Sequence, residues 1–176
     1  MNEQEALNRT AIVTGAAGGI GRATCELMLS KGWTVLATDR DAPKLDWAKD
    51  LAGIETMIAD VADEAENRAM VDEAVRLHGR LDAIVLNAAL SIGGGIEEAS
   101  LDDFDRQVAV NLRGTVLGIR AALPALRRSG GGSIVAVAMP SPPSITPRIS
   151  ASGPMMQLPP ENWTPRSSPQ RLLSIR

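Results

Sequence analysis

Residues 14–21 read TGAAGGIG, and they follow the apolar run TAIV at 10–13. Apolar residues then recur at 20, 23, 27 and 28, which is the spacing of one helix face. Gly15 allows a tight turn, and Gly19 and Gly21 allow a ligand and the helix to approach the backbone closely. The free N–H groups at a helix N-terminus attract phosphate groups. The segment predicts a strand, a phosphate-binding turn and a helix, although glycines can also simply punctuate a loop.

The same alternation of strand and helix continues outward from this turn. Short apolar runs at 10–15, 33–39, 54–60, 81–87 and 132–138 read as strands. Longer amphipathic segments at 20–30, 43–52, 63–78 and 100–128 read as helices. Strands separated by helices of this length imply a parallel sheet, and right-handed crossovers place helices on both of its faces. The sequence predicts an α/β fold of the doubly wound class.

Composition limits where the chain acts and what it binds. A chain of 176 residues has room for one domain, and no apolar run is long enough to span a bilayer. The net charge of −3, with scattered Lys and Arg, argues against a nucleic-acid partner. The start carries no signal-peptide pattern, and the single cysteine, Cys25, fits a reducing cytoplasm. The acids near residue 100 show no metal-ligand grouping, so we expect no metal site.

Two acids follow predicted strands. Asp39 lies eighteen residues after Gly21, where a carboxylate can accept both hydroxyl hydrogens of an adenosine ribose. The same charge would repel a 2′-phosphate, which favours NAD over NADP, although Arg40 weakens that preference. Asp60, followed by Val61, could bond the adenine amino group. Each acid could instead be a solvated residue at a strand end.

These features together resemble the short-chain dehydrogenase/reductase family. The agreement extends over residues 8–138 and includes NAAL at 87–90 and Asn111 in VNLRGT. The resemblance implies a Rossmann-type sheet with strand order 3-2-1-4-5 and hydride transfer between a nicotinamide cofactor and a small alcohol or carbonyl. It also implies that Asn87 flanks the cofactor ribose, and that Asn111 kinks its helix and belongs to the proton relay. The expected cofactor-binding residues are Thr14, Gly15, Gly19, Ile20, Gly21, Asp39, Arg40, Asp60, Val61, Asn87, Ala88 and Ala89.

The family's catalytic serine, tyrosine and lysine are missing. The expected serine position falls on Ala138 or Met139, and the Tyr-x-x-x-Lys positions match Ile149 and Gly153. The chain has no tyrosine, and no lysine follows Lys49. Asn111 is therefore the one catalytic residue that remains, and we expect dinucleotide binding without catalysis. The alternatives are a non-catalytic NAD-binding or regulatory module, and an enzyme completed by residues of another chain.

The composition changes abruptly after the predicted fifth strand. Residues 139–176 hold nine of the eleven prolines, which exclude a normal helix or central strand. We therefore expect a dinucleotide-binding domain at 1–138, an incomplete five-stranded sheet, and an irregular, disordered tail at 139–176. A frameshifted or truncated gene product would explain this change, and so would a divergent tail. A family-type homo-oligomer is doubtful, because the interface helix that follows the fifth strand is missing.

Overall fold

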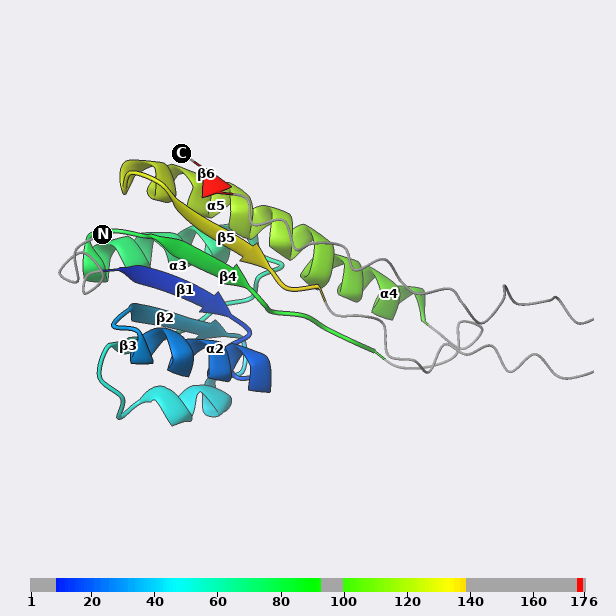
Figure 1. The fold of residues 1–176 in the computed structure, drawn as a ribbon. Coiled ribbons are helices and arrows are strands. Elements are labelled where there is room, and N and C mark those ends of the chain that lie inside the picture. Colours follow the sequence, from blue (N-terminus) through cyan, green and yellow to red (C-terminus); the bar gives the residue numbers. More distant parts are fainter. Residues whose placement is uncertain (1–8, 93–99, 139–173, 176) are drawn as a thin grey trace, which may run out of the picture.

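Five parallel strands and one short antiparallel strand form a single sheet (Figure 1). The computed structural model describes residues 9–92, 100–138 and 174–175. The strand order is β3-β2-β1-β4-β5-β6, so the five parallel strands follow the predicted order 3-2-1-4-5. The strands are β1 (Thr10–Thr14), β2 (Thr34–Asp39), β3 (Ile54–Ile58), β4 (Ala83–Leu86), β5 (Gly132–Ala136) and β6 (Ser174–Ile175).

The helices lie where the sequence predicts them, with two differences. The predicted helix at 43–52 is a short 3₁₀ helix, η1, and the long helix that ends at residue 128 is interrupted by a π-helical turn, η2. Ser100 directly precedes α4, and its side chain makes no capping hydrogen bond. The helical elements are α2 (Gly19–Ser30), η1 (Ala42–Ala48), α3 (Glu64–His78), α4 (Leu101–Val108), η2 (Ala109–Arg113) and α5 (Gly114–Arg128).

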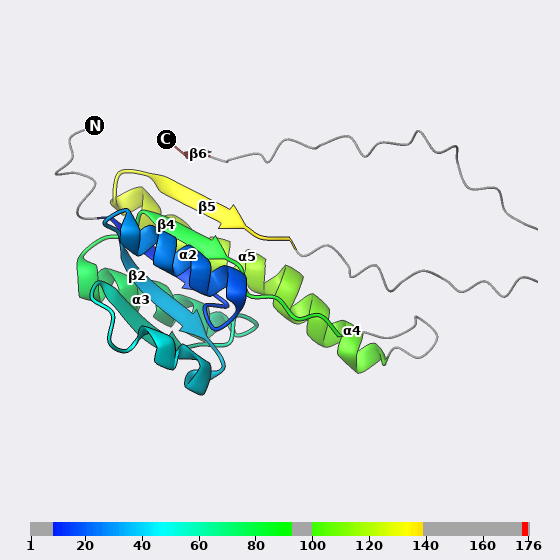
Figure 2. The same cartoon turned by 60° about the horizontal axis from the view of Figure 1, so that its bottom comes forward.

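The sheet separates two apolar cores, because successive side chains of a strand point to opposite faces. On β1, Ile12 belongs to the core beneath α3 and α5, whereas Val13 belongs to the core beneath α2 and η1. Ile84 and Val85 of β4 divide in the same way. The helices consequently lie on opposite faces of the sheet, with α2 on one and α3 and α5 on the other (Figure 2). This is the doubly wound arrangement that the alternating pattern predicts.

Helix α2 packs on the sheet through Gly21 and Cys25, which are its buried residues, and through the partly buried Met28 and Leu29. Ile20 and Leu27 are about 60% exposed. Of the apolar residues at 20, 23, 27 and 28 that the spacing places on one helix face, the one at 28 packs against the core and the other three are exposed. Burial raises the pKa of the Cys25 thiol to about 12, so this cysteine is a small core residue and not a nucleophile.

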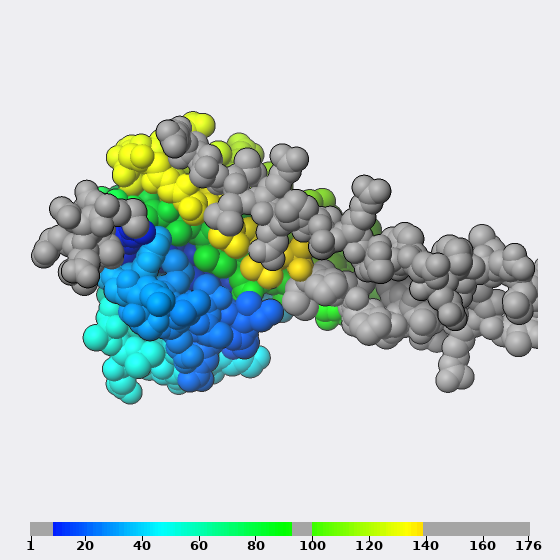
Figure 3. Space-filling view, viewed as in Figure 1, coloured from blue at the N-terminus to red at the C-terminus, as the bar shows by residue number. Residues whose placement is uncertain are grey.

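Strand β5 is the least buried of the parallel strands. Every residue of β1 is buried, whereas no residue of β5 is, and Val135 is 41% exposed. Figure 3 shows atoms of β4 and β5 at the surface beside α2. Ser174 and Ile175 pair antiparallel with Ser133 and Gly132, so these two residues of the tail, which the sequence predicts to be irregular, form a short strand. Residues 139–173 and 176 lie outside the described part of the chain.

None of the helices in the described ranges combines the length and the apolar character that crossing a membrane requires.

Candidate functional site

A cavity lies where the parallel strands end. The strand order reverses beside β1, because the chain runs from β1 to β2 on one side and from β3 to β4 on the other. Ligands of open α/β sheets bind at such a point, outside the carboxyl ends of the strands. The lining residues come from the loops after four strands and from η2: Gly15, Asp39, Arg40, Ala59, Asp60, Val61, Ala88, Ala89, Leu90 and Val110.

The glycine-rich turn is shaped by close backbone contacts. Gly15 has a φ of 67°, and a Cβ there would lie 2.8 Å from the Ala88 Cα. A Cβ on Gly21 would collide with the Gly15 carbonyl oxygen and lie 2.9 Å from the Ala16 Cα. A Cβ on Gly19, by contrast, would meet no atom within 4 Å. Two of the glycines therefore allow the turn to close, and the third leaves open space at the start of α2.

The first turn of α2 is suited to an anion. Gly18 precedes the helix and supplies no side-chain cap. The first N–H groups of a helix have no acceptor within the helix, and they carry a partial positive charge. Because the space at Gly19 is open, a phosphate group could reach these N–H groups. The residues present thus fit a dinucleotide, whose pyrophosphate would lie at this turn.

Asp39, the last residue of β2, is held by the backbone. Its Oδ2 accepts a hydrogen bond from the Ala17 N–H at 3.1 Å, and its Oδ1 accepts one from the Asp41 N–H at 3.0 Å. The Ala16 N–H donates to the Thr38 carbonyl oxygen at 3.1 Å, which ties the glycine-rich turn to β2. Each carboxylate oxygen retains a lone pair. The carboxylate is therefore fixed in the cavity wall and can still accept hydrogen bonds from a ligand.

Asp60 has a similar arrangement after β3. Its Oδ1 accepts a hydrogen bond from the Ala62 N–H at 2.8 Å, and its own N–H donates to the Glu66 carboxylate at 2.5 Å. Asp63, three residues later, caps α3 by accepting from the Glu66 N–H at 2.9 Å. The loop from Asp60 to Asp63 is thus fixed to the start of α3, and the Asp60 carboxylate lies in the cavity wall.

Thr14 and Asn87 connect the ends of β1 and β4 behind the cavity. The Thr14 hydroxyl oxygen accepts from the N–H groups of Asn87 and Ala88, both at 3.0 Å. The Asn87 amide donates to the carbonyl oxygens of Thr14 at 3.1 Å and Gly15 at 3.2 Å. These bonds set the spacing between the two central loops. Thr14 and Asn87 themselves do not line the cavity.

Asn111 lies in η2 and holds the loop after β4. Its Oδ1 accepts from the Leu90 N–H at 2.8 Å, and its Nδ2 donates to the Leu90 carbonyl oxygen at 2.9 Å. The Asn111 carbonyl oxygen also accepts from the Thr115 hydroxyl at 2.8 Å. Both polar atoms of the Asn111 amide therefore bond the backbone of Leu90, and Leu90 lines the cavity.

The cavity gathers seven of the residues that the sequence singles out, namely Gly15, Asp39, Arg40, Asp60, Val61, Ala88 and Ala89. Gly19, Ile20 and Gly21 form the first turn of α2 instead, and Ile20 is 58% exposed. Sequence reasoning missed Ala59 and Val110 as lining residues. Val110 directly precedes Asn111, and its place beside that predicted site residue could have marked it as a lining residue.

The positions expected to carry the catalytic serine, tyrosine and lysine fall at the end of the described chain or beyond it. Ala138 is exposed just after β5. Met139, Ile149 and Gly153 lie outside the described residues. Lys31, Lys44 and Lys49, the only lysines of the sequence, do not line the cavity. Within the described segments, no three His, Cys, Asp or Glu side chains are grouped as metal ligands would be.

Known proteins are similar to this chain in sequence or in fold. A 2-(R)-hydroxypropyl-CoM dehydrogenase of Xanthobacter autotrophicus is 36% identical over 141 residues, covering 75% of this chain and 56% of that protein. A D-threitol dehydrogenase of Mycolicibacterium smegmatis is 36% identical over 135 residues, covering 74% and 52% of the two chains. A short-chain dehydrogenase/reductase of Burkholderia phymatum, crystallised with NAD, superimposes with a TM-score of 0.70 at 28% identity, covering 76% and 49%.

The chain spans about half the length of these relatives. The sequence model of the short chain dehydrogenase family matches residues 9–142, which include every strand and loop of the cavity described above. The chain therefore belongs to the short-chain dehydrogenase/reductase family of oxidoreductases.

Proposed function

We propose that this chain binds a nicotinamide dinucleotide, with a preference for NAD, and that its own residues do not complete the family's catalytic reaction. The observation that carries the proposal is the cavity, in which loops from four strand ends meet beside the uncapped first turn of α2. The Burkholderia phymatum relative, whose structure holds NAD, supports the same ligand here. The cofactor supplies the hydride when it is bound.

Each part of the dinucleotide has a matching group in the cavity or beside it. The pyrophosphate would lie against the N–H groups of Gly19 and Ile20. The Asp60 carboxylate, oriented by the Ala62 N–H, would accept from the adenine amino group. The backbone of Ala88 and Ala89, held by Thr14, would flank the ribose on the nicotinamide side.

The preference for NAD rests on Asp39. Its carboxylate would accept hydrogen bonds from both adenosine ribose hydroxyls and would repel a 2′-phosphate. Arg40 lies beside it and is exposed, so its guanidinium could offset that repulsion in part. Asp41 is occupied elsewhere, because Lys44 pairs with it at 2.7 Å and this hydrogen bond lowers the pKa of Asp41. The balance between Asp39 and Arg40 therefore decides the choice of cofactor.

The proposed loss of catalysis rests on proton delivery. Reduction of a carbonyl creates an alkoxide that must be protonated, and a positioned acid accelerates such a step about 10²–10⁴-fold. The sequence has no tyrosine, and its lysines all precede β3 and do not line the cavity. Asn111 is engaged with Leu90 and supplies no acidic proton. A small alcohol or carbonyl would thus be a substrate only if another chain supplied the missing groups.

The second candidate function is a non-catalytic NAD-binding or regulatory module, and the missing proton donors favour it. In both cases residues 1–138 act as the dinucleotide-binding domain, and we expect no nucleic-acid or membrane partner. The buried free thiol of Cys25 fits the cytoplasmic location expected from the sequence.

The first test is titration of the full chain with NADH and NADPH, followed by cofactor fluorescence. We expect tighter binding of NADH. Replacing Asp39 with Asn should weaken NADH binding about tenfold, because it removes a hydrogen bond to a charged acceptor, and it should narrow the difference from NADPH. Asp46→Asn, on the exposed surface of η1, is the matched control and should change neither affinity. Tighter binding of NADPH, or an unchanged ratio in Asp39→Asn, would contradict the proposed preference.

The second test measures turnover with a panel of aldehydes, ketones and sugars, followed by NADH absorbance. The chain alone should give no rate above the uncatalysed background. Turnover by the purified chain would mean that an acid outside the described residues delivers the proton, and the module interpretation would then be wrong.

A further inference from the structure

One helical turn contacts both walls of the cavity. η2, the π-helical turn between α4 and α5, contributes Val110 to the lining directly. On the nicotinamide side, Asn111 bonds both backbone polar atoms of Leu90, at 2.8 and 2.9 Å. Turns of this kind are rare and recur at functional sites.

The last residue of the same turn contacts the opposite wall. Arg113 donates from Nη1 to the Ala62 carbonyl oxygen at 3.0 Å. The N–H of Ala62 in turn donates to the Asp60 carboxylate at 2.8 Å. Arg113 therefore holds, from outside the cavity, the residue whose N–H orients the acid expected to meet adenine. Arg113 itself is exposed and does not line the cavity.

The following residue brings the helix backbone against the same loop. A Cβ on Gly114 would lie 3.0 Å from both the Val61 Cγ2 and the Val61 carbonyl oxygen. The start of α5 thus fits closely against Val61, which lines the cavity. Since η2 runs without a break into α5, Asn111 and Arg113 belong to one rigid element. The distance between the two walls depends on that element.

We propose that Arg113 is a positioning residue for the adenosine half of the dinucleotide site. It acts through Ala62 on the orientation of Asp60, while Asn111 acts separately on the nicotinamide side through Leu90. The inference rests on the proposed function, since it concerns the same cavity. A purely structural role would predict a change in stability and no selective change in ligand binding.

The test compares AMP, which contains only the adenosine half, with NADH, by titration calorimetry on the full chain. Arg113→Gln should lower the affinity for AMP about two- to fivefold, as expected for one partly solvated hydrogen bond, and should lower the affinity for NADH by the same factor. Arg113→Lys retains a donor and should restore most of the loss. Arg120→Gln, an exposed arginine on α5 away from the cavity, is the matched control and should change neither affinity.

Asn111→Ala completes the comparison, and it should weaken NADH binding while leaving AMP binding unchanged. Thermal unfolding of each variant records any general loss of stability. The inference is wrong if Arg113→Gln binds AMP as the native chain does, if Arg113→Lys loses as much as Arg113→Gln, or if Arg120→Gln shows the same loss. If the native chain binds neither AMP nor NADH, the proposed function itself fails and the inference falls with it.

Discussion

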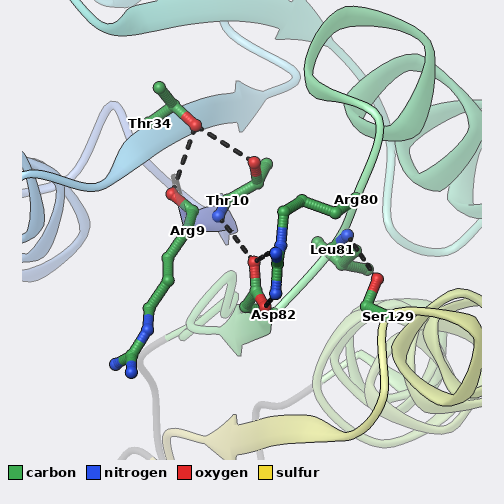
Figure 4. Close-up of polar contacts among 7 residues, drawn as sticks. All are labelled: Arg9, Thr10, Thr34, Arg80, Leu81, Asp82 and Ser129. Carbon is green, nitrogen blue, oxygen red and sulfur yellow. Dashed lines mark hydrogen bonds and ion pairs between the residues drawn. The ribbon is translucent and has the colours of Figure 1, made fainter. Parts of the chain in front are cut away.

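The polar groups at the two ends of the parallel sheet have different hydrogen-bond partners. At the amino end, the Asp82 carboxylate accepts from the Thr10 N–H at 2.9 Å and from Arg80 at 2.8 and 2.6 Å (Figure 4). The hydroxyls of Thr10 and Thr34 lie 3.1 Å apart. Polar groups from neighbouring strands therefore satisfy one another at this end. The Asp82 side chain is only 11% exposed, which makes these bonds costly to lose.

At the carboxyl end, polar residues line the cavity. Asp39 and Asp60 are each held by backbone N–H groups, with carboxylates in the cavity wall. The first turn of α2 has no side-chain cap. The difference fits a stabilising role for the amino end and the proposed ligand-binding role for the carboxyl end. Substitutions at the two ends should therefore separate stability from binding.

We expect the largest effect in the glycine-rich turn after β1, where one substitution should change both stability and NADH binding. Gly21→Ala places a Cβ against the Gly15 carbonyl oxygen, and both are backbone positions that cannot move aside cheaply. We expect the free energy of unfolding to fall by about 3 kcal/mol, at the upper end of overpacking costs, and NADH binding to be lost. Chemical denaturation and NADH fluorescence would measure the two effects.

Gly19→Ala is the matched control for that substitution. Its Cβ meets no protein atom, so stability should be unchanged or slightly raised, while NADH binding should weaken because the pyrophosphate needs the same space. Full stability of Gly21→Ala would mean that the turn is not fixed by this contact.

The second largest effect is expected at the amino end of the sheet, where a substitution should lower stability without changing NADH binding. Asp82→Asn weakens the pair with Arg80 and disturbs the bond from the Thr10 N–H, so the free energy of unfolding should fall by about 2 kcal/mol. NADH affinity should stay within about twofold, because the cavity lies at the opposite end of the strands. Asp46→Asn, whose pair with Lys49 is exposed, should cost less than about 0.5 kcal/mol. A parallel loss of NADH binding in Asp82→Asn would contradict the separation.

The smallest effect is a difference in hydrogen exchange between two strands, β5 and β1. Hydrogen exchange should be at least about tenfold faster at 134–136 in β5 than at 11–13 in β1, because β1 is paired on both edges and fully buried. Residues 132 and 133 should be intermediate, since β6 pairs with them. Equal protection throughout β5 and β1 would mean that another part of the chain covers the edge of β5.

The sheet and most of the cavity were predictable because their signals are local. Strand–helix alternation predicts a parallel sheet, and the family resemblance supplies its strand order. The carboxyl ends of the parallel strands then bring Asp39, Asp60 and Ala88 together. Hydrophobicity alone did not identify the residues of α2 that face the sheet. That helix buries Gly21 and Cys25 and partly buries Met28 and Leu29, while Ile20 and Leu27 are exposed.

Features that depend on distant partners were also missed. The pairing of Ser174 with Ser133 joins residues far apart in the sequence, and no local pattern predicts so distant a partner. The family resemblance implies a kink at Asn111, and the π-helical turn η2 lies there. The contacts of this turn with two separate loops, Asn111 with Leu90 and Arg113 with Ala62, could not be read from the helical period of the sequence.

The central position of β1 has a consequence for synthesis on the ribosome. Its first partner, β2, follows at once, but Ala11 must wait for Ala83, 72 residues further on, before its second edge is paired. At about 5–20 residues per second, translation takes roughly 4–14 seconds to cover that distance. During this interval β1, whose residues are all buried in the folded sheet, has one unpaired edge. Chaperone demand should therefore be greatest before β4 leaves the exit tunnel.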